Sequence, residues 1–264
     1  MITGVLQYLS PFTLSILRIV AGLLFWQRGM AKLFGWYGGE AVSFGSLIWA
    51  AGALETVGGP LIAIGLFTRP LAFLLAGEMA VAYGIAHMPQ GAWPLRNGGE
   101  IALLFLLIFL MLLAAGPGKI AVDQFFFRIP ALDKALDRFR PAMLTLFRIA
   151  TGILFWQHGA AKFGFLGGRI SEFPDLRFFA GVLEFFGGPL IALGVYTRAV
   201  AFLLSGEMAV AFWMSHAPRE TGFWPLQNGG EPAVLFCFMF LFLMTTGAGP
   251  WSIDGLLSHK QGKR

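Results

Sequence analysis

Charged side chains stand inside stretches of this sequence that are otherwise almost pure hydrocarbon. The stretch from Arg18 to Gly35 begins with an arginine, continues without a polar side chain from Ile19 to Phe25, and reaches Lys32. The stretch from Arg148 to Phe165 repeats the pattern, with Lys162 in the place of Lys32. An ionisable residue in a membrane span is energetically costly unless it is paired, so each of these residues is a functional candidate.

The spacing places these charges on one face of a helix. Arg18, Gly22, Phe25, Gly29 and Lys32 follow one another at intervals of 4, 3, 4 and 3 residues, which form a single stripe. Glycine in such a stripe lets a second helix approach, so we expect the stripe to face protein and the charges to point inward. The second stripe consists of Arg148, Gly152, Phe155, Gly159 and Lys162.

Glutamates near the middle of two further apolar segments could handle protons or bind polar ligand atoms. Judged by depth alone, Lys32 should pair with Glu55 and Arg18 with Glu78, and the two cations could instead contact an anionic ligand. The alternative is that buried charges only fix helix register and packing. The equivalent residues of the second copy are Glu184 and Glu207, with Lys162 and Arg148 as cations.

A motif-like loop precedes the last apolar segment of each copy, WPLRNGGE (93–100) and WPLQNGGE (224–231). Asn97 is well placed as a helix N-cap, and Glu100 follows three residues later as in a capping box. Alternatively, the loop lines a ligand pocket at the outer end of the helices. That pocket would contain Gln27, Lys32, His87, Trp93, Asn97 and Glu100, and its counterpart Gln157, Lys162, His216, Trp224, Asn228 and Glu231.

The histidines of this set, His87 and His216, stand near the end of an apolar segment just before a proline. Such a histidine could ligate a metal or haem, form a capping hydrogen bond, or exchange protons with a ligand. Because each copy has one histidine at this level, we predict no metal site.

The composition indicates an integral membrane protein. Of the 264 residues, 57% are hydrophobic and only 12% are charged, whereas a soluble domain has about 25% charged residues. The net charge of +5 arises without a basic tract, so no nucleic-acid partner is expected; the bilayer is the expected partner. The single cysteine, Cys237, excludes dithiol chemistry within one chain.

The sequence is a tandem repeat. Residues 52–87 recur without gaps as residues 181–216, which indicates duplication. Since a spanning helix needs about 20 apolar residues, we predict an all-α membrane protein with eight transmembrane helices, arranged as two parallel four-helix-bundle repeats. The expected spans are 12–34, 46–67, 70–88 and 99–116, then 142–163, 177–196, 199–217 and 230–247.

We expect three parts: repeat 1 at residues 1–121, a connector at 122–141, and repeat 2 at 142–264. The connector should be amphipathic, with Ile129, Leu132, Leu136 and Phe139 on one face, or else an ordinary linker helix. The lysine and arginine bias predicts that both termini lie in the cytoplasm, and we expect the protein in the cell (inner) membrane. The cytoplasmic set is Arg69, Lys119, Arg128, Lys134, Arg138, Arg140, Arg198, Lys260, Lys263 and Arg264, against Arg96, Arg169, Arg177 and Arg219 outside, with Lys32 and Lys162 at the outer helix ends.

The segments LRIVAGLLFWQRGMAKLFG, LExxGGPLIAIGLFTR and NGGE resemble the DoxX family of small four-helix membrane proteins, and both halves carry them. Family members usually resemble one half. The resemblance implies a four-helix bundle in each unit and an association with quinone-linked redox chemistry. The family is named for a small subunit of a terminal quinol oxidase complex, a related family forms thiosulfate:quinone oxidoreductase, and other members are membrane partners of soluble enzymes.

The function expected from these observations is that of a subunit or accessory of a quinone-linked redox system. The sequence shows no motif for an electron-carrying cofactor, so a quinone-binding partner of a redox protein is favoured over a lone oxidoreductase. The alternatives are a small-molecule transporter, which parallel repeats and midplane charges would suit, and a membrane scaffold for a soluble redox enzyme.

Overall fold

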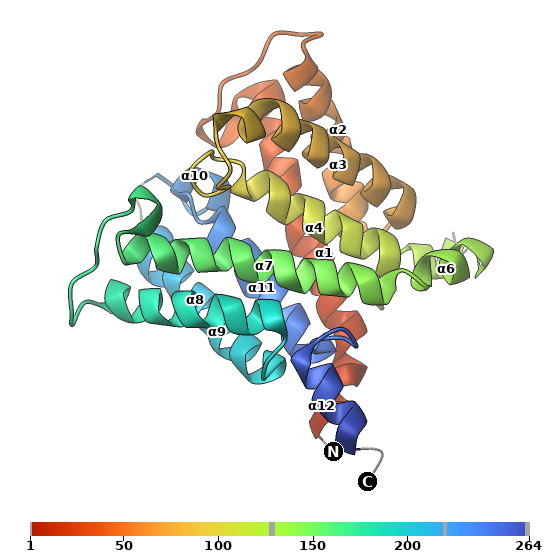
Figure 1. Cartoon of the computed structure of the whole chain (residues 1–264). Coiled ribbons are helices and arrows are strands. Elements are labelled where there is room, and N and C mark those ends of the chain that lie inside the picture. The colour runs from red at the N-terminus through yellow and green to blue at the C-terminus, as the bar shows by residue number, and fades with distance from the viewer. Residues whose placement is uncertain (1, 127–129, 219–220, 262–264) are drawn as a thin grey trace.

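Helices make up the computed structural model, which describes residues 2–126, 130–218 and 221–261 (Figure 1). Several residues used above for topology lie outside these ranges, and for Lys260 only the backbone is described. The residues outside are Arg128, Ile129, Arg219, Lys263 and Arg264.

The two repeats contain the same series of long helices. The first repeat has α1 (Ile2–Phe34), α2 (Leu47–Ile64), α3 (Thr68–Ala82) and α4 (Glu100–Ala115), and α3 continues through a π-helical turn at Tyr83–His87 and a 3-10 turn at Met88–Gln90. The short helices α5 (Asp123–Phe126) and α6 (Pro130–Asp137) follow. The second repeat has α7 (Arg140–Lys162), α8 (Leu176–Leu193), α9 (Thr197–Ala211) with a π-helical turn at Phe212–His216, α10 (Pro225–Asn228), α11 (Glu231–Thr246) and α12 (Ile253–Gln261). Single 3-10 turns at Trp36–Gly38 and Phe165–Gly167 follow α1 and α7.

Five helical segments in the described part of the chain are long and apolar enough to cross a membrane. They are Gly4–Phe34, Leu47–Ile64, Thr68–Gln90, Leu176–Leu193 and Thr197–His216. Two shorter apolar helices, α4 and α11, correspond to the expected fourth and eighth spans, and α7 to the fifth. A multi-pass membrane protein is therefore supported, whereas the full number of eight spans stays a prediction.

The glycine stripe of α1 lies against α2, as its spacing predicted. A Cβ atom at Gly22 would lie 2.6 Å from the carbonyl oxygen of Gly59, so no larger residue fits there without moving the helices apart. In the second repeat, a Cβ atom at Gly152 would lie 2.5 Å from the carbonyl oxygen of Gly188. The close approach of these helix pairs is what brings the charged side chains of α1 and α7 against the carboxylates of α2 and α8.

The two predicted four-helix bundles are interleaved. In each repeat, the fourth long helix packs more extensively on the first helix of the other repeat than on the first helix of its own, so that α4 lies along α7 and α1 along α11 (Figure 1). Side-chain hydrogen bonds join α1 to α11, with Ser10 Oγ 2.7 Å from Thr246 Oγ1 and Thr13 Oγ1 2.6 Å from Thr245 Oγ1. One hydrophobic core therefore runs through both repeats.

Aromatic side chains fill this core in the same way in both halves. Phe25 of the α1 stripe makes edge contacts with two phenylalanines of α4, with both pairs of ring centroids 5.0 Å apart. Phe155 of α7 makes the equivalent contacts with two phenylalanines of α11, at 5.0 and 4.8 Å. The inward orientation predicted for the stripe is confirmed.

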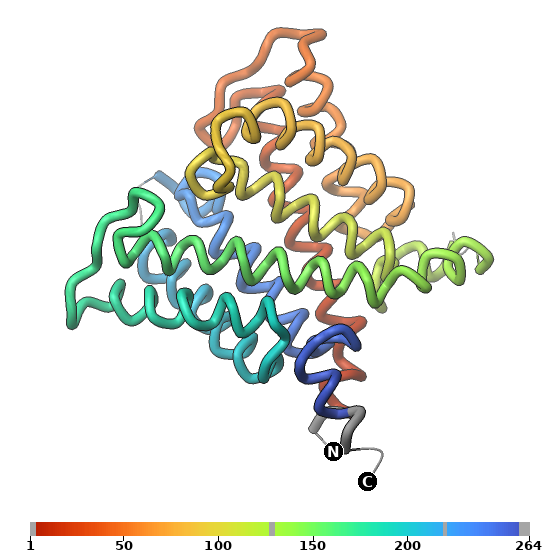
Figure 2. Tube along the Cα trace, in the orientation of Figure 1, coloured from red at the N-terminus to blue at the C-terminus, as the bar shows by residue number. Residues whose placement is uncertain are grey.

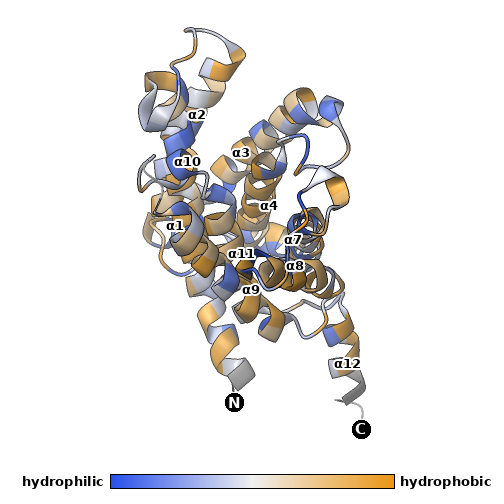
Figure 3. Ribbon diagram, turned by 90° about the vertical axis from the view of Figure 1, so that its left-hand side faces the viewer, coloured by the Kyte–Doolittle hydropathy of each residue, from blue (hydrophilic) through white to orange (hydrophobic). Residues whose placement is uncertain are grey.

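The long helices consist mostly of hydrophobic residues (Figure 3). Large hydrophobic side chains are exposed along α2, α3, α8 and α9, among them Val57, Phe73, Leu183 and Phe202. Contiguous apolar surface of this kind marks contact with a membrane. The beginning of α1 and the helix α12 lie at the same end of the molecule (Figures 1 and 2).

The segment after the last long helix of each repeat docks on the turn between its second and third helices. The carboxylate of Asp123 accepts hydrogen bonds from the backbone N–H groups of Phe67 and Thr68, both at 2.8 Å, and so caps the start of α3. Asp254 does the same for α9. The docking of Asp123 ties the beginning of the connector to repeat 1.

Candidate functional site

Lys32 and Glu55 form an ion pair in the interior of repeat 1. The Nζ atom of Lys32 lies 2.5 Å from Oε1 of Glu55, and the Glu55 side chain is only 1% exposed. This is the pair expected from the depth of the two residues. Lys162 and Glu184 form the same pair in repeat 2, with Nζ 2.5 Å from Oε1.

Glu78 lies beside this pair, with its carboxyl group close to that of Glu55. Both of its carboxylate oxygens are buried and accept no hydrogen bond from the described residues, although Glu55 and Lys32 are within electrostatic reach. Glu207 repeats the arrangement beside Glu184 and Lys162. A buried carboxyl group with open oxygens is able to gain and lose a proton or to accept a hydrogen bond from a ligand.

The second repeat contributes a carboxylate to the cluster of the first. Glu231, at the start of α11, accepts from Arg28 of α1 at 3.0 Å through Nε and at 2.6 Å through Nη2. Arg28 and Glu231 are close enough to Glu55 to interact with it electrostatically. The first polar cluster therefore consists of Arg28, Lys32, Glu55, Glu78 and Glu231.

The second polar cluster is built reciprocally. Glu100, at the start of α4, has its Oε1 2.7 Å from Nε2 of His158 on α7. His158 occupies the position that Arg28 holds in repeat 1. The second polar cluster consists of His158, Lys162, Glu184, Glu207 and Glu100. The two clusters are thus alike in their Lys–Glu–Glu core and differ in one cation, an arginine in one and an imidazole in the other.

The expected pairing of Arg18 with Glu78 is wrong. The guanidinium group of Arg18 is fully buried and donates to the carbonyl oxygen of Ile120, beyond the end of α4. Arg148 likewise donates to backbone carbonyls, those of Ala192, of Ile191 at 2.9 Å and of Trp251 at 2.8 Å. Carbonyl groups left open at a helix end attract cations. Both arginines therefore hold the polypeptide together at the end of the helices far from the clusters.

The capping box expected for the loop 93–100 is also wrong. Gly99, not Asn97, is the N-cap residue of α4, and no side chain caps it. Asn97 instead accepts from the N–H of Gly99 at 2.9 Å and donates to the carbonyl of Gly91 at 2.8 Å, which closes the loop on itself. The carboxylate of Glu100 is free to reach across to the other repeat.

The histidines of the third helices contact this loop. Nδ1 of His87 lies 3.0 Å from the carbonyl oxygen of Asn97, and Nδ1 of His216 lies 3.1 Å from that of Asn228. The geometry matches the hydrogen-bonding role considered for these histidines. Within the described ranges, no group of three or more His, Cys, Asp and Glu side chains could hold a metal ion.

Other residues that were expected to meet within one repeat meet residues of the other repeat instead. The loop 93–100 meets Gln157 of repeat 2 and not Gln27 of its own repeat, because the N–H of Leu95 donates to Oε1 of Gln157 at 3.2 Å. Trp93 packs against Trp156 with ring centroids 6.1 Å apart. Trp224 correspondingly packs against repeat 1, with its ring 5.6 Å from that of Tyr37.

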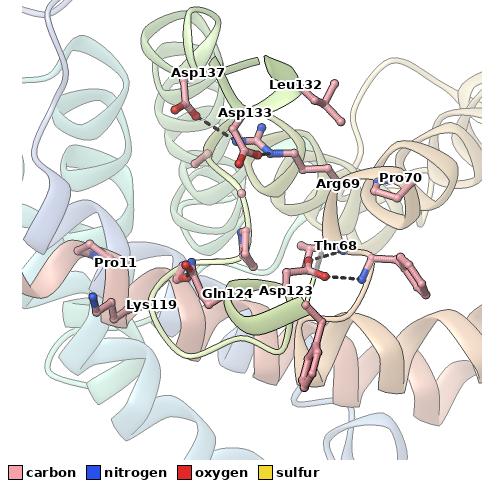
Figure 4. A pocket seen from close by; sticks show the side chains of 16 residues that line it. Pro11, Thr68, Arg69, Pro70, Lys119, Asp123, Gln124, Leu132, Asp133 and Asp137 are labelled. Carbon is pink, nitrogen blue, oxygen red and sulfur yellow. Dashed lines mark hydrogen bonds and ion pairs between the residues drawn. The ribbon is translucent and has the colours of Figure 1, made fainter. Parts of the chain in front are cut away.

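A pocket lies beside the connector, at the end of repeat 1 that is far from the polar clusters (Figure 4). It has a volume of about 600 Å³, and Arg69 stands on its wall. Arg69 is already engaged, because Asp137 of α6 accepts a hydrogen bond from it at 3.0 Å, Asp133 forms an ion pair with its Nε at 3.0 Å, and the carbonyls of Leu113 and Ala114 accept from its Nη1. This contact fixes the connector helix on repeat 1.

Two members of the polar clusters, Arg28 and His158, were not among the predicted site residues. The signal available in the sequence was their equivalent position in the two copies, one turn before Lys32 and Lys162. Their partners could not be found by comparing depths within one repeat, because each partner comes from the other repeat.

Comparison with known proteins gives matches in both halves of the chain. The family model of DoxX matches residues 13–88 and 143–217. An "Uncharacterized protein" of Haemophilus influenzae is 38% identical over 131 residues, which cover 47% of this chain and 98% of that protein. Relatives of this length correspond to one repeat.

Two more distant relatives carry descriptive names. An "Uncharacterized membrane protein" of Mycobacterium tuberculosis is 28% identical over 148 residues, covering 50% of this chain and 91% of that protein. A Bacillus subtilis protein named "Putative oxidoreductase CatD" is 29% identical over 119 residues, covering 43% and 86%. No solved structure matches the chain significantly.

Proposed function

Because this chain belongs to the DoxX family of membrane proteins, we propose that it is a subunit or accessory of a quinone-linked redox system in which the two polar clusters exchange protons. Reduction of a quinone takes up protons together with electrons. The electrons come from a partner redox protein, and the carboxyl groups inside this chain provide a route for the protons. The name of the Bacillus subtilis relative supports an oxidoreductase context.

The observation that carries the proposal is the state of Glu78 and Glu207. Each side chain is half-buried in an apolar helix with both carboxylate oxygens inside the protein, and these oxygens have no hydrogen-bond donor among the described residues. Each lies next to a Lys–Glu ion pair, where a proton can pass between two carboxylates. A group that served packing alone would be expected to have its polar atoms satisfied.

The structure gives less support to the alternatives. A transporter of parallel repeats would be expected to use broken helices at its substrate site, but α2 runs without interruption through Gly58 and Pro60, and α8 through Gly187 and Pro189. A scaffold needs no open carboxylates in its interior.

Lipid extraction of the purified protein tests the proposal. We expect a quinone to co-purify, and a short-chain quinone to raise the unfolding temperature of the delipidated protein. Absence of both effects would contradict the proposal. The variant E78Q/E207Q serves as the matched control, because it keeps the size of both side chains and should still bind quinone while losing proton exchange.

The membrane arrangement is part of the proposal. Eight helices cross the inner membrane, and both termini lie in the cytoplasm, as the excess of arginine and lysine on that side predicts. A periplasm-active reporter enzyme fused after α12 should be inactive; an active fusion would contradict this orientation.

A further inference from the structure

A pocket lies between the repeats where α4 runs along α7. Its volume is about 250 Å³, and Trp93, Leu107, Ala150, Ile153 and Gln157 are among the residues that line it. Ile153 and Trp93 are 47% and 40% exposed, so the pocket opens on the outer surface of the helices. In the proposed arrangement of eight spanning helices this surface faces the hydrocarbon of the membrane, so a molecule dissolved in the bilayer can enter the pocket from the side.

The pocket is polar at one end only. Gln157 is fully buried at the end of the pocket where Trp93 also lies. Ala150 lies seven residues earlier on α7, which is about 10 Å along the helix axis. Oε1 of Gln157 accepts from the backbone of the loop, but its Nε2 has no hydrogen-bond partner among the described residues. The pocket thus has the side-chain NH2 group of Gln157, which has no partner among the described residues, at one end, and aliphatic side chains along the rest of its length.

We propose that this pocket binds a membrane-dissolved molecule that carries a carbonyl group on a hydrocarbon body. The carbonyl oxygen accepts a hydrogen bond from Nε2 of Gln157, and the apolar part lies between α4 and α7. A quinone has this chemistry, and so does the ester group of a membrane lipid. The assignment to quinone rests on the proposed function. Gln157 directly precedes His158, a member of the second polar cluster.

The opposite side of the molecule provides an internal comparison. Where Ala150 and Leu107 line the pocket, the equivalent positions between α1 and α11 carry the larger side chains Val20 and Phe238. These side chains pack against the core, and α1 and α11 contact each other more extensively than α4 and α7 do. Tyr37 also stands between Trp26 and Trp224 there, with ring centroids 6.4 and 5.6 Å away. We therefore expect one such site per chain, although the chain is a duplication.

Equilibrium titration of the full chain in nanodiscs with a short-chain quinone tests the proposal. The variant L107F/A150V fills the pocket with the residues of the other side and should weaken binding at least about tenfold. The reciprocal variant V20A/F238L should leave the affinity of the existing site unchanged.

Replacing Gln157 by leucine should weaken binding about tenfold, the usual effect of one buried hydrogen bond, whereas Gln27→Leu should not. Each variant is first compared with wild type by thermal unfolding without quinone, and a variant that fails to fold is replaced by the single substitution A150V.

The possible outcomes separate the two proposals. Quinone binding that is equally tight in wild type and in L107F/A150V overturns the pocket and leaves the proposed function standing. If wild type binds no quinone, but a diacyl lipid co-purifies with it and is lost from L107F/A150V, then the pocket is confirmed as a lipid site and the quinone function fails. If neither molecule depends on the pocket residues, the inference is wrong.

Discussion

Replacing Lys32 by methionine would leave the carboxylate of Glu55 in the protein interior without its cation. Glu55 is 1% exposed, and Nζ of Lys32 lies 2.5 Å from its Oε1. Removing one partner of a buried ion pair costs about 3–5 kcal/mol. At pH 7 the carboxyl group can take up a proton instead. This costs about 1.4 kcal/mol for each pH unit above the pKa of glutamate in solution, which is about 4.3, and therefore about 3.7 kcal/mol in all.

We therefore expect K32M to lower the free energy of unfolding by about 3–4 kcal/mol at pH 7 and by about 1 kcal/mol at pH 5. The sign follows because the folded variant binds a proton that the unfolded chain lacks above pH 4.3, so its stability falls as pH rises. Denaturant unfolding in mixed micelles measures both values, and K32M/E55Q should recover most of the loss. A loss below about 0.5 kcal/mol, or an equal loss at both pH values, would refute the reasoning.

Further variants test the helix packing, the cap of α3 and the contact between the repeats. Gly65→Ala should lower the free energy of unfolding by about 2 kcal/mol or more, because Gly65 has φ +74° and the new methyl group would collide with the buried guanidinium of Arg18. The control Gly77→Ala adds a methyl group that meets nothing within 4 Å, so its free energy of unfolding should be nearly unchanged. Asp123→Ala should cost about 1–2 kcal/mol in the same assay by removing the cap of α3, and a neutral effect would contradict the capping role. Exchanging the charges of one inter-repeat pair, R28E/E231R, should restore the thermal stability lost by R28E alone; no recovery would show that the pair does not form.

The sequence predicts well what lies within one pair of adjacent helices. The glycine stripe of α1 specified its contact with α2, and the depths of Lys32 and Glu55 on those two helices were sufficient to pair them. Depth failed for Arg18 because its guanidinium group donates to a backbone carbonyl instead, that of Ile120 in the loop after α4.

Contacts between the repeats could not be read from the sequence. Arg28 and His158 lie at the same depth in the two repeats, so by depth either could be the partner of Glu100 or of Glu231. Only the three-dimensional packing decides that each glutamate pairs with the other repeat. The spacing of the motif predicts Asn97 as the cap, but Gly98, with φ +70°, lets the chain turn so that Gly99 becomes the N-cap residue of α4.

The central claim is that the buried carboxyl groups exchange protons with a quinone, and infrared difference spectroscopy of the quinone-loaded protein tests it most directly. Electrochemical reduction of the quinone should change the carbonyl-stretch band of a protonated carboxyl group, the band should shift in D₂O, and it should be lost in E78Q/E207Q. A spectrum without a carboxyl band, or one that is the same in E78Q/E207Q as in wild type, would contradict the account.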